Sequence, residues 1–189
     1  MKPLLRFDAV ALRRGGRLLF DGLDLKLGPG EALRLTGPNG SGKSSLIRLA
    51  AGLLRAEAGR VERAAPALSD EALALDRELP LGRALRFWGD DGRLDQAMEA
   101  IGLAALREVP VRLLSAGQAK RGTLARVAAS GARLWLLDEP LNGLDADGIE
   151  RLDALIAGHR ATGGAVLAAS HAPLGGDWAR LELGQGGAA

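Results

Sequence analysis

The chain contains no cysteine and no tyrosine, and only three Phe and three Trp among its 189 residues. The absence of cysteine excludes disulfides and thiolate metal sites and permits a reducing compartment. The scarcity of aromatic rings leaves few platforms on which nucleic-acid bases could stack. Arginines are dispersed among acidic residues and the net charge is only +2, so we expect no nucleic acid as the primary partner.

Long apolar stretches are missing as well. No uninterrupted apolar run reaches the about 18 residues of a membrane span. The N-terminal segment 1–6 carries charge too early for the apolar region of a signal peptide. We therefore expect a cytoplasmic protein in which residues 1–189 form a single domain, with no room for a second catalytic domain.

Lysine is scarce, and one of only four lysines, Lys43, lies in a glycine-rich run. The run matches the pattern G-x-x-x-x-G-K-[ST] and is made of Gly37, Pro38, Asn39, Gly40, Ser41, Gly42, Lys43 and Ser44. A strand-like alternation over 31–36 precedes it, and the apolar face of a helix that ends near Gly52 follows it. Strand, glycine loop and helix are the arrangement that phosphate binding requires.

This loop predicts a nucleoside triphosphate as the substrate. Glycines let the backbone turn its N–H groups inward around phosphate oxygens. Lys43 would reach the β- and γ-phosphates, Ser44 would ligate Mg²⁺, and Ser45 would line the same site. The alternative, an ordinary Gly-rich turn, leaves the flanking strand and helix unexplained.

The rest of the chain alternates between strand and helix patterns. Segments 4–12 and 18–27 are predicted strands of an N-terminal β-layer. From about Ser69 to Leu113 Ala, Leu, Arg and Glu dominate, which predicts a helical insert. Beyond it, 134–137 and 165–169 are predicted strands, with a helix between them lined by Ile149, Leu152, Leu155 and Ile156. The Gly/Ala tail after Leu183 is expected to be disordered.

Two carboxylates, Asp138 and Glu139, end the predicted buried strand 134–137. The carboxyl ends of parallel strands are where α/β folds place their ligands. Asp138 suits the Mg²⁺ shell, and Glu139 suits a general base that orients or deprotonates the attacking water. The alternative is a polar strand end that simply reaches solvent.

A third segment consists of Leu114, Ser115, Ala116, Gly117 and Gln118. Ser115 followed by Gln118 is a capping box, so a helix begins here with unpaired N–H groups that favour anions. An ordinary helix cap is the alternative. The segment resembles the signature motif of ABC ATPases, usually written LSGGQ, with alanine for the first glycine. Segment 140–145, ending at Asp145, resembles their D-loop, and His171 resembles their switch histidine.

The resemblance covers nearly the whole chain and implies the P-loop NTPase fold of the ABC ATPase type. This is an α/β fold with a RecA-like core, an N-terminal antiparallel β-layer and a short helical signature subdomain, here about 69–125. It also implies that Lys43, Glu139 and His171 are catalytic. In this family two nucleotide-binding domains pair head to tail and the signature acts on the partner's ATP, so a homodimer is expected.

Within the family, the alanine-containing signature, the pair Lys120-Arg121 and the ending 170–174 are most similar to ATP-binding subunits of haem exporters in cytochrome c maturation. That likeness implies integral membrane partners and a peripheral position on the cytoplasmic face of the inner membrane. The ATPase of another small ABC exporter is the first alternative. The second is a soluble ABC ATPase without a membrane partner, and the third is a non-hydrolysing nucleotide switch, which Glu139 argues against.

Two positions depart from the family pattern. Arg14 stands where most members stack an aromatic ring on adenine, which predicts weaker discrimination of ATP from GTP. Asp76 or a neighbour stands near the place of the glutamine of the Q-loop. His159 is interpreted as a solvated residue at the end of a surface helix.

Overall fold

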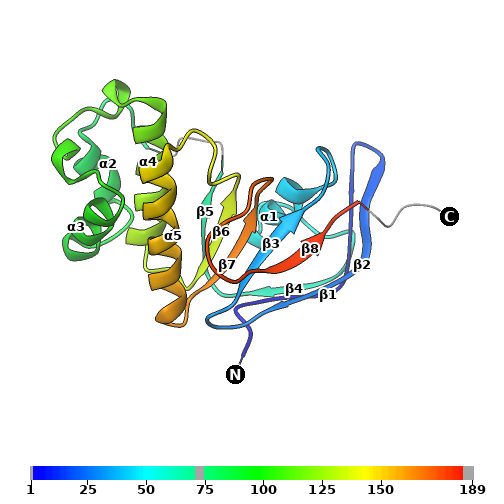
Figure 1. Ribbon diagram of the computed structural model, residues 1–189. Coiled ribbons are helices and arrows are strands. Elements are labelled where there is room, and N and C mark those ends of the chain that lie inside the picture. The colour runs from blue at the N-terminus through cyan, green and yellow to red at the C-terminus, as the bar shows by residue number, and fades with distance from the viewer. Residues whose placement is uncertain (1, 71–74, 185–189) are drawn as a thin grey trace.

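The computed structural model describes residues 2–70 and 75–184. The fold consists of two β-sheets and the helices that pack against them (Figure 1). The larger sheet has the strand order β5-β6-β7-β3-β8, and every neighbouring pair in it is parallel. Its strands are β3 (Ala32–Thr36), β5 (Pro66–Ser69), β6 (Leu134–Asp138), β7 (Ala165–Ala169) and β8 (Ala179–Glu182). The chain is therefore of the predicted α/β class.

The smaller sheet is the predicted N-terminal β-layer. It is antiparallel in the order β2-β1-β4, with β1 at Leu5–Arg14, β2 at Arg17–Leu27 and β4 at Ala58–Arg63. Gly15 and Gly16 both have positive φ, so the β1–β2 hairpin reverses within two residues. Figure 1 shows this layer beneath and beside β3 and β8, on the far side of the molecule from the helices α2 to α5.

The central strands β6 and β7 are buried along their whole length because apolar side chains alternate between two cores. On β6, Trp135 and Leu137 belong to one core, while Leu134 and Leu136 belong to the other. The second core includes α1 (Lys43–Ala51) and the β-layer. The first is completed by the helices on the opposite face of the sheet.

The helical insert lies between β5 and β6. It comprises α2 (Leu81–Arg86), α3 (Asp91–Ala100), two 3₁₀ turns (Ala104–Leu106 and Val111–Leu113) and α4 (Ala116–Ala129). Helix α5 (Ala146–Ala161) follows β6 and lies beside α4 in Figure 1. The predicted end of the insert, 125, falls inside α4. None of the helices in these described ranges is long and apolar enough to cross a membrane.

The strands predicted at 4–12, 18–27, 31–36, 134–137 and 165–169 are confirmed within one or two residues, as are the helices after Gly42 and Ser115. Strands β4, β5 and β8 were not predicted. The tail after Leu183, expected to be disordered, lies almost entirely outside the described residues.

Candidate functional site

The phosphate loop begins where β3 ends. Gly37 has φ 132°, and a Cβ there would meet the carbonyl oxygen of Leu183 at 2.2 Å. Gly42, with φ 102°, is the N-cap of α1 and packs against Leu19 of β2. Glycine is therefore required at both positions, by backbone conformation and by close approach. Within the described part of the chain, no side chain caps α1, and its first turn holds no acidic residue, so the N-terminal N–H groups of α1 are available to an anion.

Two polar side chains of the loop show how it would hold phosphate. Lys43 is only 7% exposed, and its Nζ donates hydrogen bonds to the carbonyl oxygens of Gly37 and Pro38 at 2.8 and 3.1 Å. The ammonium group therefore lies over the loop. Ser41 is buried, and its hydroxyl has no hydrogen-bond partner among the residues that the structure describes. A buried hydroxyl without a partner carries a desolvation cost that a phosphate oxygen would remove.

The carboxyl ends of β6 and β7 lie at the same edge of the sheet as this loop. Asp138, the last residue of β6, is buried and accepts a hydrogen bond from the Ser44 hydroxyl through its Oδ1 at 3.1 Å. Hydroxyl and carboxylate oxygens are the ligands that Mg²⁺ takes alongside water and phosphate. These oxygens therefore fit Mg²⁺, which Ser44 and Asp138 would hold.

Glu139 follows Asp138 in a left-handed backbone conformation, with φ 47°. Its N–H donates to the carbonyl of Ala169 at the end of β7, which ties the turn to the sheet. The side chain is 18% exposed, and its Oε1 lies 3.4 Å from Nε2 of His171. His171 follows Ser170, a buried residue whose hydroxyl donates to the carbonyl of Ala172. The predicted base and the predicted switch histidine thus contact each other.

Lys43, Ser44, Glu139 and His171 share one cleft of about 540 Å³. It is lined by Arg14, Leu19, Asn39, Gly40, Gly42, Lys43, Ser44, Ser45, Glu139, Asn142 and His171. Leu19 and Asn142 were not singled out from the sequence. A cation, hydroxyls and a carboxylate around an uncapped helix N-terminus can bind a phosphate chain and hold a water beside it.

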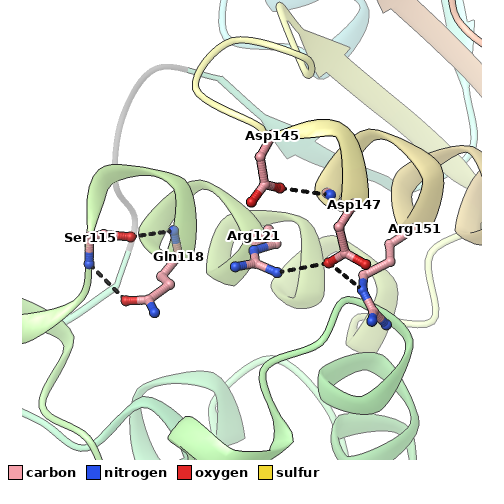
Figure 2. A network of polar contacts seen from close by, with 7 residues as sticks. Ser115, Gln118, Arg121, Asp145, Asp147 and Arg151 are labelled. Carbon is pink, nitrogen blue, oxygen red and sulfur yellow. Dashed lines mark hydrogen bonds and ion pairs between the residues drawn. The ribbon is translucent and has the colours of Figure 1, made fainter.

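The predicted signature begins helix α4, as its capping box required. Ser115 Oγ accepts from the N–H of Gln118, and the N–H of Ser115 donates to Gln118 Oε1 (Figure 2). Ser115 and Ala116 are exposed. Among the described residues, no signature residue lines the cleft that contains Lys43. The structure therefore brings Lys43, Asp138, Glu139 and His171 together and leaves the signature outside the cleft.

Helix α4 is held to the start of α5 at two points. Gly117 lies so close to the carbonyl of Gly143 that a Cβ would approach it to 2.9 Å. Arg121, largely buried, pairs with Asp147 at 3.6 Å, and Arg151 donates to the same carboxylate (Figure 2). The hydrogen bond from Arg151 holds the pKa of Asp147 below its ordinary value. Asp145 caps α5 by accepting from the N–H of Gly148.

Among the described acidic residues of the insert, Asp70 lines a pocket with Glu139, whereas Asp76 does not. Asp70 follows β5 and lines a smaller pocket together with Glu139, Asn142 and Lys120. Asp76 accepts a hydrogen bond from the N–H of Glu78 in an exposed turn. The neighbouring positions 71–74 lie outside the described residues. If the sequence had predicted a strand at 66–69, Asp70 would have been expected at the carboxyl edge of the sheet, where the candidate site lies.

The interpretation of His159 as solvated is wrong. Its ring is half-buried and stacks on Trp135 of β6, with centroids 3.8 Å apart and planes 10° from parallel. Burial lowers the pKa of His159 below its ordinary value. The position of His159 near the end of a helix does not predict its stacking on Trp135, because that contact forms only in the tertiary fold.

Comparison with known proteins decides the family. The sequence family described as ABC transporter matches residues 20–142. The chain belongs to the ABC transporter family of ATPases. It is 58% identical over 177 residues to the cytochrome c biogenesis ATP-binding export protein CcmA of Sphingopyxis alaskensis, covering 90% of this chain and 91% of that protein. Its identity to the protein of the same name from Novosphingobium aromaticivorans is 60% over 166 residues, 87% of each chain.

Solved structures of ABC transporter subunits have the same fold as this chain. A solved ATP-binding subunit of an ABC transporter superposes with a TM-score of 0.81 at 21% identity, over 89% of this chain and 79% of that one. A nucleotide-free ATP-binding cassette from an ABC transporter gives 0.74, also at 21% identity, over 90% and 82%. These structures confirm the predicted fold class, while the family match and the relatives confirm the recognition of the family and the ATP-hydrolysing activity.

Proposed function

We propose that this chain is the ATP-hydrolysing subunit of a membrane exporter that serves cytochrome c biogenesis by driving the export or release of haem. The family establishes the ATPase, and the relatives named as cytochrome c biogenesis export proteins support the pathway. The observation that carries the activity is the shared cleft in which Lys43, Ser44 and Glu139 lie together.

In this proposal the loop binds the triphosphate chain and Lys43 exchanges its contacts with loop carbonyls for contacts with β- and γ-phosphate oxygens. Ser44 and Asp138 would hold Mg²⁺, which when bound would supply positive charge to offset the charge on the phosphoryl group. Glu139 orients and deprotonates the attacking water. His171, in contact with Glu139, stabilises that geometry.

The exposed signature supports a homodimer that forms when ATP is bound. Ser115, Ala116 and Gly117 begin a helix whose N-terminal dipole and N–H groups suit the γ-phosphate of a nucleotide held by a partner. We further propose that the whole chain acts as one nucleotide-binding domain. It would bind integral membrane subunits peripherally, at the cytoplasmic face of the inner membrane, with no role for nucleic acid.

A pull-down from detergent-solubilised membranes tests the transport part. The tagged chain should co-purify with small integral membrane proteins, and haem should be found in the complex. Membrane partners without haem would favour the ATPase of another small exporter. Recovery of the chain alone, while it still hydrolyses ATP, would favour a soluble ABC ATPase.

A further inference from the structure

A second cleft, of about 810 Å³, lies at the amino edge of the parallel sheet. Pro66 begins β5 and Arg133 directly precedes β6, and both residues line this cleft. The phosphate loop lies at the opposite edge, because it follows the carboxyl end of β3, which runs parallel to β7 and β6. We call the second cleft the basic cleft, after Lys2, Arg60, Arg63 and Arg133.

Cations that are dispersed in the sequence come together in the basic cleft. Among the described residues that line it, Lys2, Arg60, Arg63 and Arg133 are cations and Glu62 is the only carboxylate. This set has a net charge of +3, whereas the whole chain has +2. Glu62 pairs with Arg60 at 2.9 Å, while the other three cations form no ion pair with a described carboxylate. Three of the four cations therefore keep their attraction for an anion from solution.

The cations enter the cleft from three separate segments. Lys2 precedes β1, Arg60 and Arg63 lie on β4, and Arg133 lies before β6. Charged side chains on an edge strand such as β4 can also serve to prevent pairing with another chain. That role does not require Lys2 or Arg133, which belong to other segments. Cations placed around one hollow suit a compact anion.

Two of the arginines are held by contacts with the backbone. Arg133 donates from Nη2 to the carbonyl of Gly163 at 3.1 Å and keeps further N–H groups for a ligand. Arg63 lies so close to Gly52, the C-cap of α1, that a Cβ at Gly52 would overlap its guanidinium. The negative end of the α1 dipole would otherwise repel an anion here, and Arg63 offsets that repulsion.

The chemistry of the lining indicates which anion fits. A guanidinium can donate two parallel hydrogen bonds to phosphate oxygens, so three guanidiniums can serve more than one phosphate group. The described lining residues include no aromatic ring, so a nucleotide base would find nothing on which to stack. The cleft therefore suits phosphate groups without a base.

We propose that the basic cleft is a second anion site, separate from the nucleotide site, and that it binds a compact anion with two or more phosphate groups. A free oligophosphate and the headgroup of a lipid with two phosphates share this chemistry. The site requires neither ATP hydrolysis nor an exporter, so it goes beyond the function proposed above.

Calorimetry with inorganic tripolyphosphate tests the site, in metal-free buffer and with the nucleotide site filled by excess ADP. Wild type should bind tripolyphosphate, and Arg63→Ala and Arg133→Ala should each weaken binding by about 10-fold, as expected for a lost charge-assisted contact. The matched control is Arg83→Ala, because Arg83 is exposed on α2 and does not line the cleft. It should leave binding unchanged. Glu62→Gln removes a negative charge from the cleft and should strengthen binding several-fold.

Sedimentation with vesicles separates the two sources of phosphate. Vesicles of phosphatidylcholine with cardiolipin, whose headgroup has two phosphates, are compared with vesicles of phosphatidylcholine alone. Cardiolipin-dependent binding that Arg63→Ala and Arg133→Ala weaken would assign the cleft to a lipid headgroup. Binding of tripolyphosphate without binding to these vesicles would assign it to a free oligophosphate. Either result supports the proposed chemistry.

Three results would overturn the proposal. Wild type that binds neither tripolyphosphate nor the cardiolipin vesicles would exclude this ligand class. Binding that is lost in Lys43→Ala but unaffected by Arg63→Ala and Arg133→Ala would place the anion at the phosphate loop. Equal weakening by Arg83→Ala would show general attraction to a cationic surface. If Arg63→Ala lowers the unfolding midpoint, Arg133→Ala and Glu62→Gln still decide, since neither changes the contact with Gly52.

Discussion

The phosphate loop and the signature helix are both built around helix N-termini, yet they differ in burial and in their partners. At the loop, Lys43 is almost fully buried, and Ser44 in α1 is hydrogen-bonded to Asp138 at the end of β6. At the signature, Ser115 is exposed and its hydrogen bonds close on its own helix. In the proposed dimer, one half of each ATP site is assembled inside the chain, while the other half is presented at its surface.

The largest effect should come from the buried half. Glu139→Gln is expected to retain ATP binding and to lower turnover by about 10²–10⁴-fold, the range for loss of a general base. Steady-state phosphate release measures it, and size exclusion with ATP should show a trapped dimer. A fall of only a few fold would mean that another residue orients the water.

Lys43→Ala tests the same half through binding. Removing the buried ammonium should weaken Mg·ATP affinity by about 100-fold, because the β- and γ-phosphates lose the closest fixed cation of the loop. Calorimetric titration measures it. Ser44→Ala is the matched comparison, and it should reduce Mg²⁺ dependence more than binding of metal-free nucleotide. Near-normal affinity in Lys43→Ala would contradict the loop assignment.

The exposed half is tested by mixing two inactive chains. Homodimers of Lys43→Ala and of Ser115→Arg each carry a lesion at every site. In the heterodimer one site carries both lesions and the other carries none, so part of the activity should return if the helix N-terminus acts across the interface. If heterodimers form and bind ATP yet stay inactive, the two halves do not combine as proposed or must act together.

The smallest effect concerns His159, which lies outside both halves. Its pKa is lowered by burial, so the unfolded chain binds the proton more readily than the folded one. The resulting stability is complete above the ordinary pKa of 6.5 and is lost as pH falls below it. Compared with wild type, His159→Phe, which keeps a ring against Trp135, should lose less melting temperature between about pH 7.5 and pH 5.5. An equal loss in both proteins would show that other groups cause it.

The sequence predicted central elements better than edges. Strands β6 and β7 lie inside the sheet and are buried throughout, so their apolar runs are unmistakable. Strands β4, β5 and β8 lie at sheet edges with mixed or exposed patterns, and β5 even begins with proline. Pairing partners, not local sequence, make these segments strands.

In the candidate site, residues within contiguous motifs were predicted better than residues that only the fold brings there. Residues within contiguous motifs, such as Lys43 and Glu139, were found because the motif itself encodes the turn that orients them. Asp70 was missed because its strand was missed, and Asn142 and Leu19 line the cleft only through the fold. The stack of His159 on Trp135 joins residues 24 positions apart and has no local signal.

The left-handed backbone of Glu139 has a consequence for how this protein can change. A side chain at φ 47° costs about 1 kcal/mol or more of folding stability compared with glycine, whose missing Cβ removes the clash. Selection for robustness alone would therefore favour glycine at 139. A carboxylate at this position indicates that chemistry is kept there against the preference of the backbone, and directed evolution for heat resistance without an activity screen would be expected to replace it.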